Sequence, residues 1–288
     1  MKNNRILSFL IIVAIYTLAA VIGLYIFNSL SYLKNLFIKL LVADVCATVV
    51  VYIFSLILKN ASVYDPYWSV QPIVICFALA IGKKNLSLSN VILLAIIATW
   101  GIRLTLNWAY TFKNLTNQDW RYTMLKEKTG IFYPIVNLLG THMFPTIVVW
   151  LLILPVVLSI ANNYAFNPLS VPFYLLSIGA ILLESFSDVQ MHSYKKKRDA
   201  NFIRRGLWKY SRHPNYLGEI LMWWGVVLSV FVVNLEIWNL FLGAIVNTLM
   251  FLFISIPMAD KRQAKKKGYE EYKNQTRMLL PIKKTEKQ

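Results

Sequence analysis

The sequence predicts an all-α protein, a bundle of membrane-spanning helices with both termini in the cytoplasm. Hydrophobic residues fill 57% of the 288 positions and the mean hydropathy is +0.53, which is more apolar surface than one soluble core of this size buries. Lysine and arginine outnumber aspartate and glutamate by 30 to 13, and they gather in a few polar interruptions. That distribution is typical of a multi-pass membrane protein.

About eight apolar segments are candidate spans, with seven as the alternative count. A spanning helix needs about 20 predominantly apolar residues. The first segment is longer than the hydrophobic core of a signal peptide, so we expect it to remain in the protein as a membrane anchor. The third, which contains Pro72, and the seventh are short and are candidates for partly re-entrant segments. The eight segments cover residues 6–28, 36–58, 68–82, 88–110, 143–161, 169–187, 217–233 and 236–256.

The positions of the basic residues favour cytoplasmic termini. Eight lysines and arginines lie between Lys195 and Arg212, and ten more follow Pro257. In an eight-span topology both stretches face the cytoplasm, as the positive-inside rule requires. Lys83 and Lys84 are the exception, because the same count places them outside.

Several functional classes find no support in the composition. No polar segment is long enough to form a basic nucleic-acid-binding module. Cys46 and Cys76 fall inside apolar runs without His or Cys at ligand spacing, so we expect neither a disulfide nor a metal site. A single membrane-embedded domain, residues 1–288, is the predicted organisation.

Ionisable residues inside apolar segments are the first candidates for function, because each costs about 2.5–3.5 kcal/mol at a helix centre. Asp44 lies in the middle of the second segment, and Arg103 interrupts the fourth. A structural salt bridge between the two would explain both, and a functional polar site is the alternative. Glu184 and Asp188 share a helical face, where a ligand, or Lys195 or Arg198, would neutralise them.

Two further polar groups lie at expected membrane edges. Asp65, followed by Pro66 and Tyr67, is a candidate proton donor whose pKa burial would raise. Its aromatic neighbours equally suit an interface belt. Asp119 and Arg121, in the polar interruption from about residue 111 to 142, either bind polar groups of a ligand or form a solvated pair.

The stretch from Gly206 to Ile220 carries the strongest binding signal. Arg212 and His213 offer donors for phosphate or carboxylate, and Pro214 starts a helix. Asn215 and Glu219 share one face of that helix. A basic loop that leads such polar groups into an apolar helix indicates a binding site. In the tail, Tyr269 and Tyr272 among many cations suit a stacked, phosphate-bearing ligand or anionic lipid headgroups.

These motifs resemble the bacterial membrane proteins of the DUF1295 family, relatives of steroid 5-alpha reductases. The resemblance rests on dispersed segments between about residues 44 and 281, which is nearly the whole chain. They are residues 206–219, 65–69, 100–104, 119–122 and 269–281.

The resemblance implies a helix bundle around NADPH, whose hydride reduces a carbon–carbon double bond conjugated to a ketone. It assigns residues 188–288 as the cofactor-binding half, with a basic cluster that suits the 2′-phosphate of NADPH. Asp65, oriented by Tyr67, would be the acid at the substrate carbonyl. Asp44, Arg103, Asp119, Arg121 and Glu184 would be substrate-contacting or structural polar residues. The cofactor residues would be Asp188, Lys195, Tyr210, Arg212, His213, Asn215, Glu219, Tyr269 and Tyr272.

Two other functional classes stay open. The Arg-His-Pro-x-Tyr core, Arg212 to Tyr216, also resembles isoprenylcysteine carboxyl methyltransferases, which bind S-adenosylmethionine. A non-enzymatic membrane protein or transporter would use Asp44, Arg103 and Glu184 to line a polar path. The sequence favours the reductase, with the lipid bilayer and a lipophilic small molecule as its partners.

Overall fold

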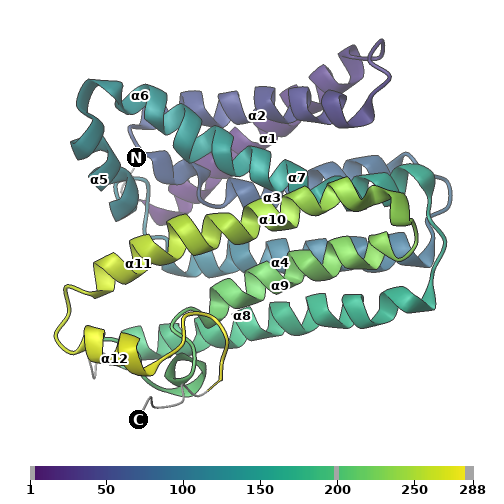
Figure 1. Cartoon of the computed structure of the whole chain (residues 1–288). Helices are drawn as coiled ribbons and strands as arrows, with labels where there is room; N and C mark the ends of the chain where they lie inside the picture. The colour runs from purple at the N-terminus through teal and green to yellow at the C-terminus, as the bar shows by residue number, and fades with distance from the viewer. Residues whose placement is uncertain (1–3, 198–200, 283–288) are drawn as a thin grey trace. The chain divides into compact units, whose positions relative to one another are not determined.

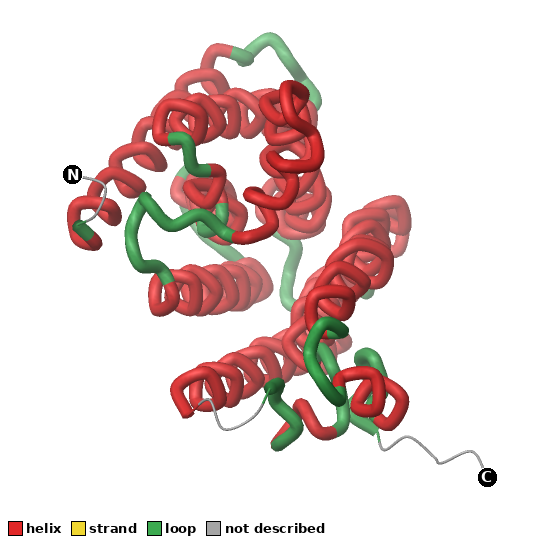
Figure 2. Tube along the Cα trace, turned by 90° about the vertical axis from the view of Figure 1, so that its left-hand side faces the viewer, coloured by secondary structure: helices red, strands yellow, loops and turns green. Residues whose placement is uncertain are grey.

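The computed structural model describes residues 4–197 and 201–282, and it contains helices and connecting loops without a strand in these ranges. Figure 2 shows the helices joined mostly by short loops. Arg198, one of the expected neutralising residues, lies outside the described residues. The helices are α1 (Arg5–Ser29), α2 (Leu36–Leu58), α3 (Tyr67–Ile81), α4 (Leu88–Thr111), α5 (Trp120–Thr129), α6 (Tyr133–Val136), α7 (Phe144–Asn162), α8 (Val171–Lys197), α9 (Pro214–Phe231), α10 (Phe241–Met250), α11 (Ile256–Gln263) and α12 (Tyr269–Gln275).

Six helical segments of the described chain are long and apolar enough to cross a membrane. They begin or end within a few residues of six of the eight expected spans. The other two expected spans form α3, with 15 residues, and α9, with 18 residues. Both are shorter than the roughly 20 residues of a full span, in line with the short third and seventh segments.

The polar interruption before α7 is mostly helical. Asp119 caps α5, because its side chain accepts a hydrogen bond from the Arg121 amide at 2.9 Å. A π-helix, Asn137–Met143, then leads directly into α7. The apolar segment with its helical lead-in therefore runs from Trp120 to Asn162.

The chain forms two compact units. The first unit comprises the residues up to Gly82 together with Trp100–Leu154, and the second comprises Lys83–Thr99 and the residues from Pro155 onward. In the first unit α1 packs closely on α2, since a Cβ atom at Gly23 would lie 3.3 Å from the Ala47 Cβ. The start of α3 likewise meets α4, where a Cβ atom at Gly101 would lie 2.5 Å from the Ser69 carbonyl oxygen.

In the second unit α8 and α9 run side by side (Figure 1). Two glycines seven residues apart on α9 allow this close approach. A Cβ atom at Gly218 would lie 2.4 Å from the Glu184 Cγ, and one at Gly225 would lie 2.2 Å from the Ser177 hydroxyl oxygen. Small residues at such positions let helices pack closely where lipid removes the hydrophobic drive to associate.

Replacing Gly225 by alanine should destabilise the protein by about 1–3 kcal/mol, because the added methyl group meets the Phe173 carbonyl oxygen and forces the helices apart. The matched control is Gly179→Ala on α8, where a Cβ atom meets nothing within 4 Å. That change should be neutral or add up to about 1 kcal/mol through helix propensity. Thermal unfolding of the detergent-solubilised variants measures both, and equal effects would contradict the packing role.

Candidate functional site

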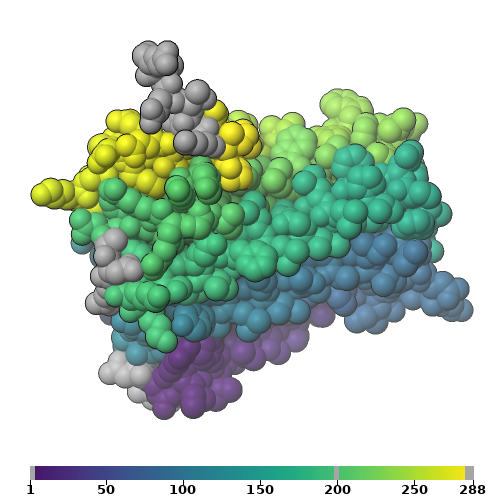
Figure 3. Space-filling model, turned by 90° about the horizontal axis from the view of Figure 1, so that it is seen from below, coloured from purple at the N-terminus to yellow at the C-terminus, as the bar shows by residue number. Residues whose placement is uncertain are grey.

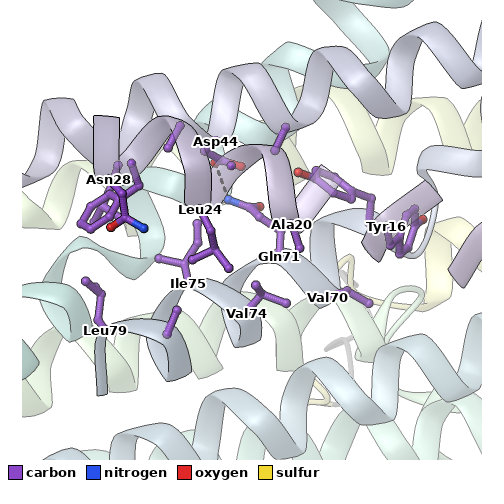
Figure 4. Close-up of a pocket in the computed structure, with 17 residues that line it drawn as sticks. Tyr16, Ala20, Leu24, Asn28, Asp44, Val70, Gln71, Val74, Ile75 and Leu79 are labelled. Atoms are coloured by element: carbon purple, nitrogen blue, oxygen red, sulfur yellow. Dashed lines mark hydrogen bonds between the residues drawn. The ribbon is translucent and has the colours of Figure 1, made fainter. Parts of the chain in front are cut away.

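The first unit contains a pocket of about 300 Å³ enclosed by α1, α2 and α3. Its wall is apolar except for a few polar groups, of which Asp44 and Gln71 are central. Figure 4 shows Gln71 on α3 pointing toward Asp44 on α2, with Asn28 and Tyr16 toward opposite ends. The lining residues are Tyr16, Ala20, Gly23, Leu24, Phe27, Asn28, Leu40, Ala43, Asp44, Ala47, Tyr67, Val70, Gln71, Val74, Ile75, Ala78 and Leu79.

Asp44 and Gln71 form a buried hydrogen-bonded pair at this pocket. The Gln71 side-chain amide donates to Asp44 Oδ2, and the two residues are only 3% and 4% exposed. Asp44 Oδ1 and Gln71 Oε1 have no hydrogen-bond partner within the described residues. The hydrogen-bond partner of Asp44 is thus Gln71, at a position where the sequence had left a salt bridge to Arg103 open. A buried polar atom without a partner costs about 1–3 kcal/mol, so a ligand group that bonds to this pair would be favoured.

Tyrosines pack at the Tyr16 end of the pocket. The rings of Tyr16 and Tyr67 have centroids 5.3 Å apart, and Tyr67 also packs against Tyr64 at 5.5 Å. The Tyr16 hydroxyl donates to the Val63 carbonyl oxygen at 2.5 Å, which fixes α1 to the segment before α3. Tyr67 therefore lines the pocket together with Asp44.

A second polar cluster joins two loops of the first unit, and it contains three of the predicted site residues. Arg121 Nη2 lies 3.6 Å from Asp65 Oδ1, and Arg121 Nε lies 2.7 Å from Asp119 Oδ1. The Tyr122 hydroxyl donates to Asp65 Oδ1 at 2.5 Å. The structure thus brings Asp65, Asp119 and Arg121 together, and the tyrosine that binds Asp65 is Tyr122.

The loops themselves are tied by side-chain to backbone hydrogen bonds. Asn60 donates to the Leu115 carbonyl oxygen at 2.8 Å, and the Ala61 amide donates to Gln118 Oε1 at 3.0 Å. The Asp119 amide donates to the Ser62 hydroxyl at 2.8 Å. The setting of Asp65 is therefore fixed by contacts across about 57 residues of sequence.

Burial raises the pKa of Asp65 to about 6, against the opposing effects of Arg121 and of the hydrogen bond from Tyr122. The direction matches the sequence-based expectation for this residue. Tyr122 and Arg121, however, already bind the Asp65 carboxyl group within the cluster.

In the second unit Asp260 binds three of the residues expected at a cofactor. Arg212 Nη2 lies 3.1 Å from Asp260 Oδ2, and His213 Nε2 lies 2.9 Å from Asp260 Oδ1. The Tyr269 hydroxyl donates to Asp260 Oδ1 at 2.5 Å. Burial and this hydrogen bond raise the pKa of Tyr269, so its hydroxyl keeps the proton that it donates. Tyr272 donates to the Trp208 carbonyl oxygen at 2.5 Å.

The same contacts fasten the C-terminal segment onto the loop before α9. The amides of Arg212 and His213 donate to the carbonyl oxygens of Arg277 and Met278 at 2.9 and 3.2 Å. Arg212 Nη1 also donates to the Thr276 carbonyl oxygen at 2.7 Å. Figure 3 shows the yellow C-terminal residues lying against the green residues of this loop. Arg212, His213 and Tyr272 therefore build the scaffold of this end of the unit.

The other predicted cofactor residues lie at the same end of the second unit. Asn215 is in the first turn of α9, and its Oδ1 is buried without a hydrogen-bond partner in the described part of the chain. Glu219 accepts a hydrogen bond from Trp223 Nε1 at 2.8 Å, one turn further along α9. Lys195 and Tyr210 are exposed and Asp188 is half-buried, while Glu184 is buried against Gly218.

Sequence reasoning missed three residues of these sites as site residues: Gln71, Tyr122 and Asp260. Tyr122 follows Asp119 and Arg121 directly, so its motif was a usable signal. Gln71 and Asp260 gave none, because their partners Asp44 and Arg212 are 27 and 48 residues away in sequence. Among the described residues, no three His, Cys, Asp or Glu side chains are grouped as metal ligands.

The long apolar helices make the chain an integral, multi-pass membrane protein. Its residues 51–276 match the model of DUF1295, a family described as protein of unknown function, and the chain belongs to this family. No curated protein and no solved structure matches it.

The raised pKa of Asp65 predicts a pH dependence of stability. The folded protein holds the proton of Asp65 more tightly than the unfolded chain does, because the carboxyl group of an unfolded chain has its ordinary pKa of 3.8. The stabilisation is therefore complete below about pH 4 and is lost as the pH rises through about 6. Asp65→Asn should abolish this fall in thermal stability between about pH 4 and 6. Glu270→Gln, at an exposed carboxylate, should retain it, and an unchanged profile in Asp65→Asn would contradict the assignment.

Proposed function

We propose that this protein is a membrane-embedded reductase that uses NADPH to reduce a conjugated carbon–carbon double bond in a lipophilic substrate. The observation that carries the proposal is the apolar pocket with the Asp44–Gln71 pair in its wall. Apolar pockets with few convergent polar groups are the usual binding sites for small molecules. The likeness of the motifs to those of steroid 5-alpha reductases supports the reaction type.

Asp44 is better placed than Asp65 to act on a substrate in this pocket. Asp44 lines the pocket and has Oδ1 without a partner among the described residues. Asp65 is held by Tyr122 and Arg121 and is not among the lining residues. We therefore assign to Asp44, supported by Gln71 and Tyr67, the role that the sequence suggested for Asp65, which is to polarise the substrate carbonyl oxygen.

The end of the second unit that carries Asn215 suits NADPH. Asn215 Oδ1 has no hydrogen-bond partner among the described residues, so it can accept a hydrogen bond from an amide or a hydroxyl group of the cofactor. The cofactor would be held by Asn215, Glu219 and Lys195. The loop before α9 is fastened to the C-terminal segment by Arg212, His213 and Tyr272. When bound, NADPH supplies the hydride. The reduction adds this hydride and one proton across the double bond.

The proposed topology keeps both termini in the cytoplasm. Exposed lysines at the end of α8, Lys195 to Lys197, and the basic residues of α11 and its following loop support it. Such basic segments remain on the cytoplasmic side of a membrane.

Thermal stabilisation of the purified protein tests the cofactor. NADPH should raise the melting temperature and S-adenosylmethionine should not, because the proposed site is built for a hydride donor. Asn215→Ala should weaken NADPH binding by about tenfold or more through loss of a buried hydrogen-bonding group. Asn28→Ala, in the first unit, should leave it unchanged. Stabilisation by S-adenosylmethionine alone would establish the methyltransferase class instead.

Activity assays on enones of increasing chain length test the assignment of the acid. Asp44→Asn should lower kcat by about 100-fold or more while NADPH binding stays normal, because the amide keeps the contact with Gln71 but gives up no proton. Asp65→Asn is the matched control and should retain most of the activity. The reverse pattern would return the catalytic role to Asp65.

A further inference from the structure

The pocket of the first unit is a long slot whose two ends differ in chemistry. Its lining residues run along α1 from Tyr16 to Asn28, and those of α3 span an equal stretch. Such a stretch of helix rises about 18 Å, so the slot is elongated along the helices. Figure 4 shows Asn28 and Tyr16 toward opposite ends, with the Asp44–Gln71 pair between them. A ligand that fills the slot is therefore elongated too.

A lysine lies at the Asn28 end of the slot. Lys39, in the first turn of α2, places its ammonium group 4.1 Å from the centroid of the Phe27 ring, and Phe27 lines the pocket. Lys39 is half-buried and forms no ion pair in the described part of the chain. An ammonium group has three N–H donors, so contact with one ring face leaves donors available. Lys39 can therefore bind an anion at this end of the pocket.

The charges of the surrounding segment favour an anion at this end. From Asn28 to Lys39 the chain carries Lys34 and Lys39 and no acidic residue. The helix dipole of α2 has its positive end here, and its first turn holds no acidic residue. The Tyr16 end is different, because the described residues that line it are aromatic or aliphatic. A negative group is therefore favoured at the Lys39 end, and an apolar group at the Tyr16 end.

We propose that the substrate is an amphipathic carboxylic acid, whose carboxylate binds Lys39 and whose apolar chain runs past Asp44 toward Tyr16. This inference names the substrate class of the proposed reductase and rests on that function. A single ammonium group at the pocket balances the one charge of a carboxylate, whereas a phosphate monoester carries up to two.

The spacing along α2 also restricts where the reacting group lies in such a substrate. Lys39 and Asp44 are five residues apart on this helix, which is about 7–8 Å along its axis. The carbonyl group that Asp44 polarises would therefore lie several bonds from the carboxylate. The rest of the chain would occupy the Tyr16 end.

The position of Lys39 suits a substrate that enters from the bilayer. Lysines near the ends of spanning helices extend their ammonium groups to the polar interface, while their stems stay in apolar surroundings. The charged head of an amphipathic acid lies at the same interface. Its chain can move from the bilayer into the slot while the head stays at that level, so the charge does not cross the apolar interior.

Binding of two matched probes to the purified protein in phosphatidylcholine nanodiscs tests this inference. The probes are a linear long-chain enone with a terminal carboxylate and the methyl ester of the same compound. The wild type should bind the acid about tenfold or more tightly than the ester, because the ester loses the charge-assisted contact with Lys39. Lys39→Met keeps the apolar stem and should abolish this preference by weakening only the binding of the acid. Lys39→Arg keeps the charge and should retain most of the preference.

Lys34→Met is the matched control, because it removes the same charge from an exposed lysine in the loop before α2. It should leave the preference for the acid unchanged. Lys39→Gln serves as a second variant should Lys39→Met fail to fold. Equal affinity of the wild type for acid and ester, or an unchanged preference in a folded Lys39→Met or Lys39→Gln protein, would overturn the inference and leave the reductase standing.

Two further measurements separate this inference from its alternatives. Phosphatidylglycerol added to the nanodiscs should leave the binding of the ester unchanged. Displacement of both acid and ester would assign the slot to a phospholipid and overturn the substrate class. In the presence of NADPH the protein should reduce the acid faster than the ester at low concentration. Binding that depends on Lys39 without any reduction would overturn the proposed function, and the substrate role with it, but would leave the anion site.

Discussion

The need of buried carboxyl groups for partners shapes much of this protein. A carboxyl group removed from water must bind a donor inside the chain, because an unpaired buried polar group is costly. Asp44, Asp65 and Asp260 each meet this need in a different way. Asp44 binds Gln71, Asp65 binds Tyr122 and Arg121, and Asp260 binds Arg212 with His213 and Tyr269.

These three arrangements separate scaffold from reactive site. The carboxyl groups of Asp65 and Asp260 are surrounded by several donors and fasten loops, which suits a structural role. Asp44 has one donor among the described residues and lies in the wall of a pocket. A polar group that is buried and only partly bonded is costly, and proteins keep such groups where a ligand completes the bonding. This contrast underlies the assignment of the acid to Asp44.

Close helix packing lets the polar groups meet. Gly23 brings α1 onto α2 beside the pocket, and Gly101 brings α4 onto the start of α3. In the second unit Gly218 and Gly225 hold α9 on α8, so that Asn215 and Glu219 are presented at the end of a fixed helix pair. At Gly101, Gly218 and Gly225 a Cβ atom would lie within 2.7 Å of a backbone carbonyl oxygen of the neighbouring helix, so a side chain there would separate the backbones.

The sequence by itself determined that the chain is helical, crosses a membrane several times and carries unusual polar groups, because composition and the length of apolar runs are local properties. It also indicated Asp44, Asp65 and the region around Arg212 as places of interest. Only the tertiary structure decided the partners: Gln71 for Asp44, Tyr122 for Asp65, Asp260 for Arg212 and Thr146 for Tyr64. Each partner is 27 to 82 residues away, and no periodicity along a chain records which helix faces which.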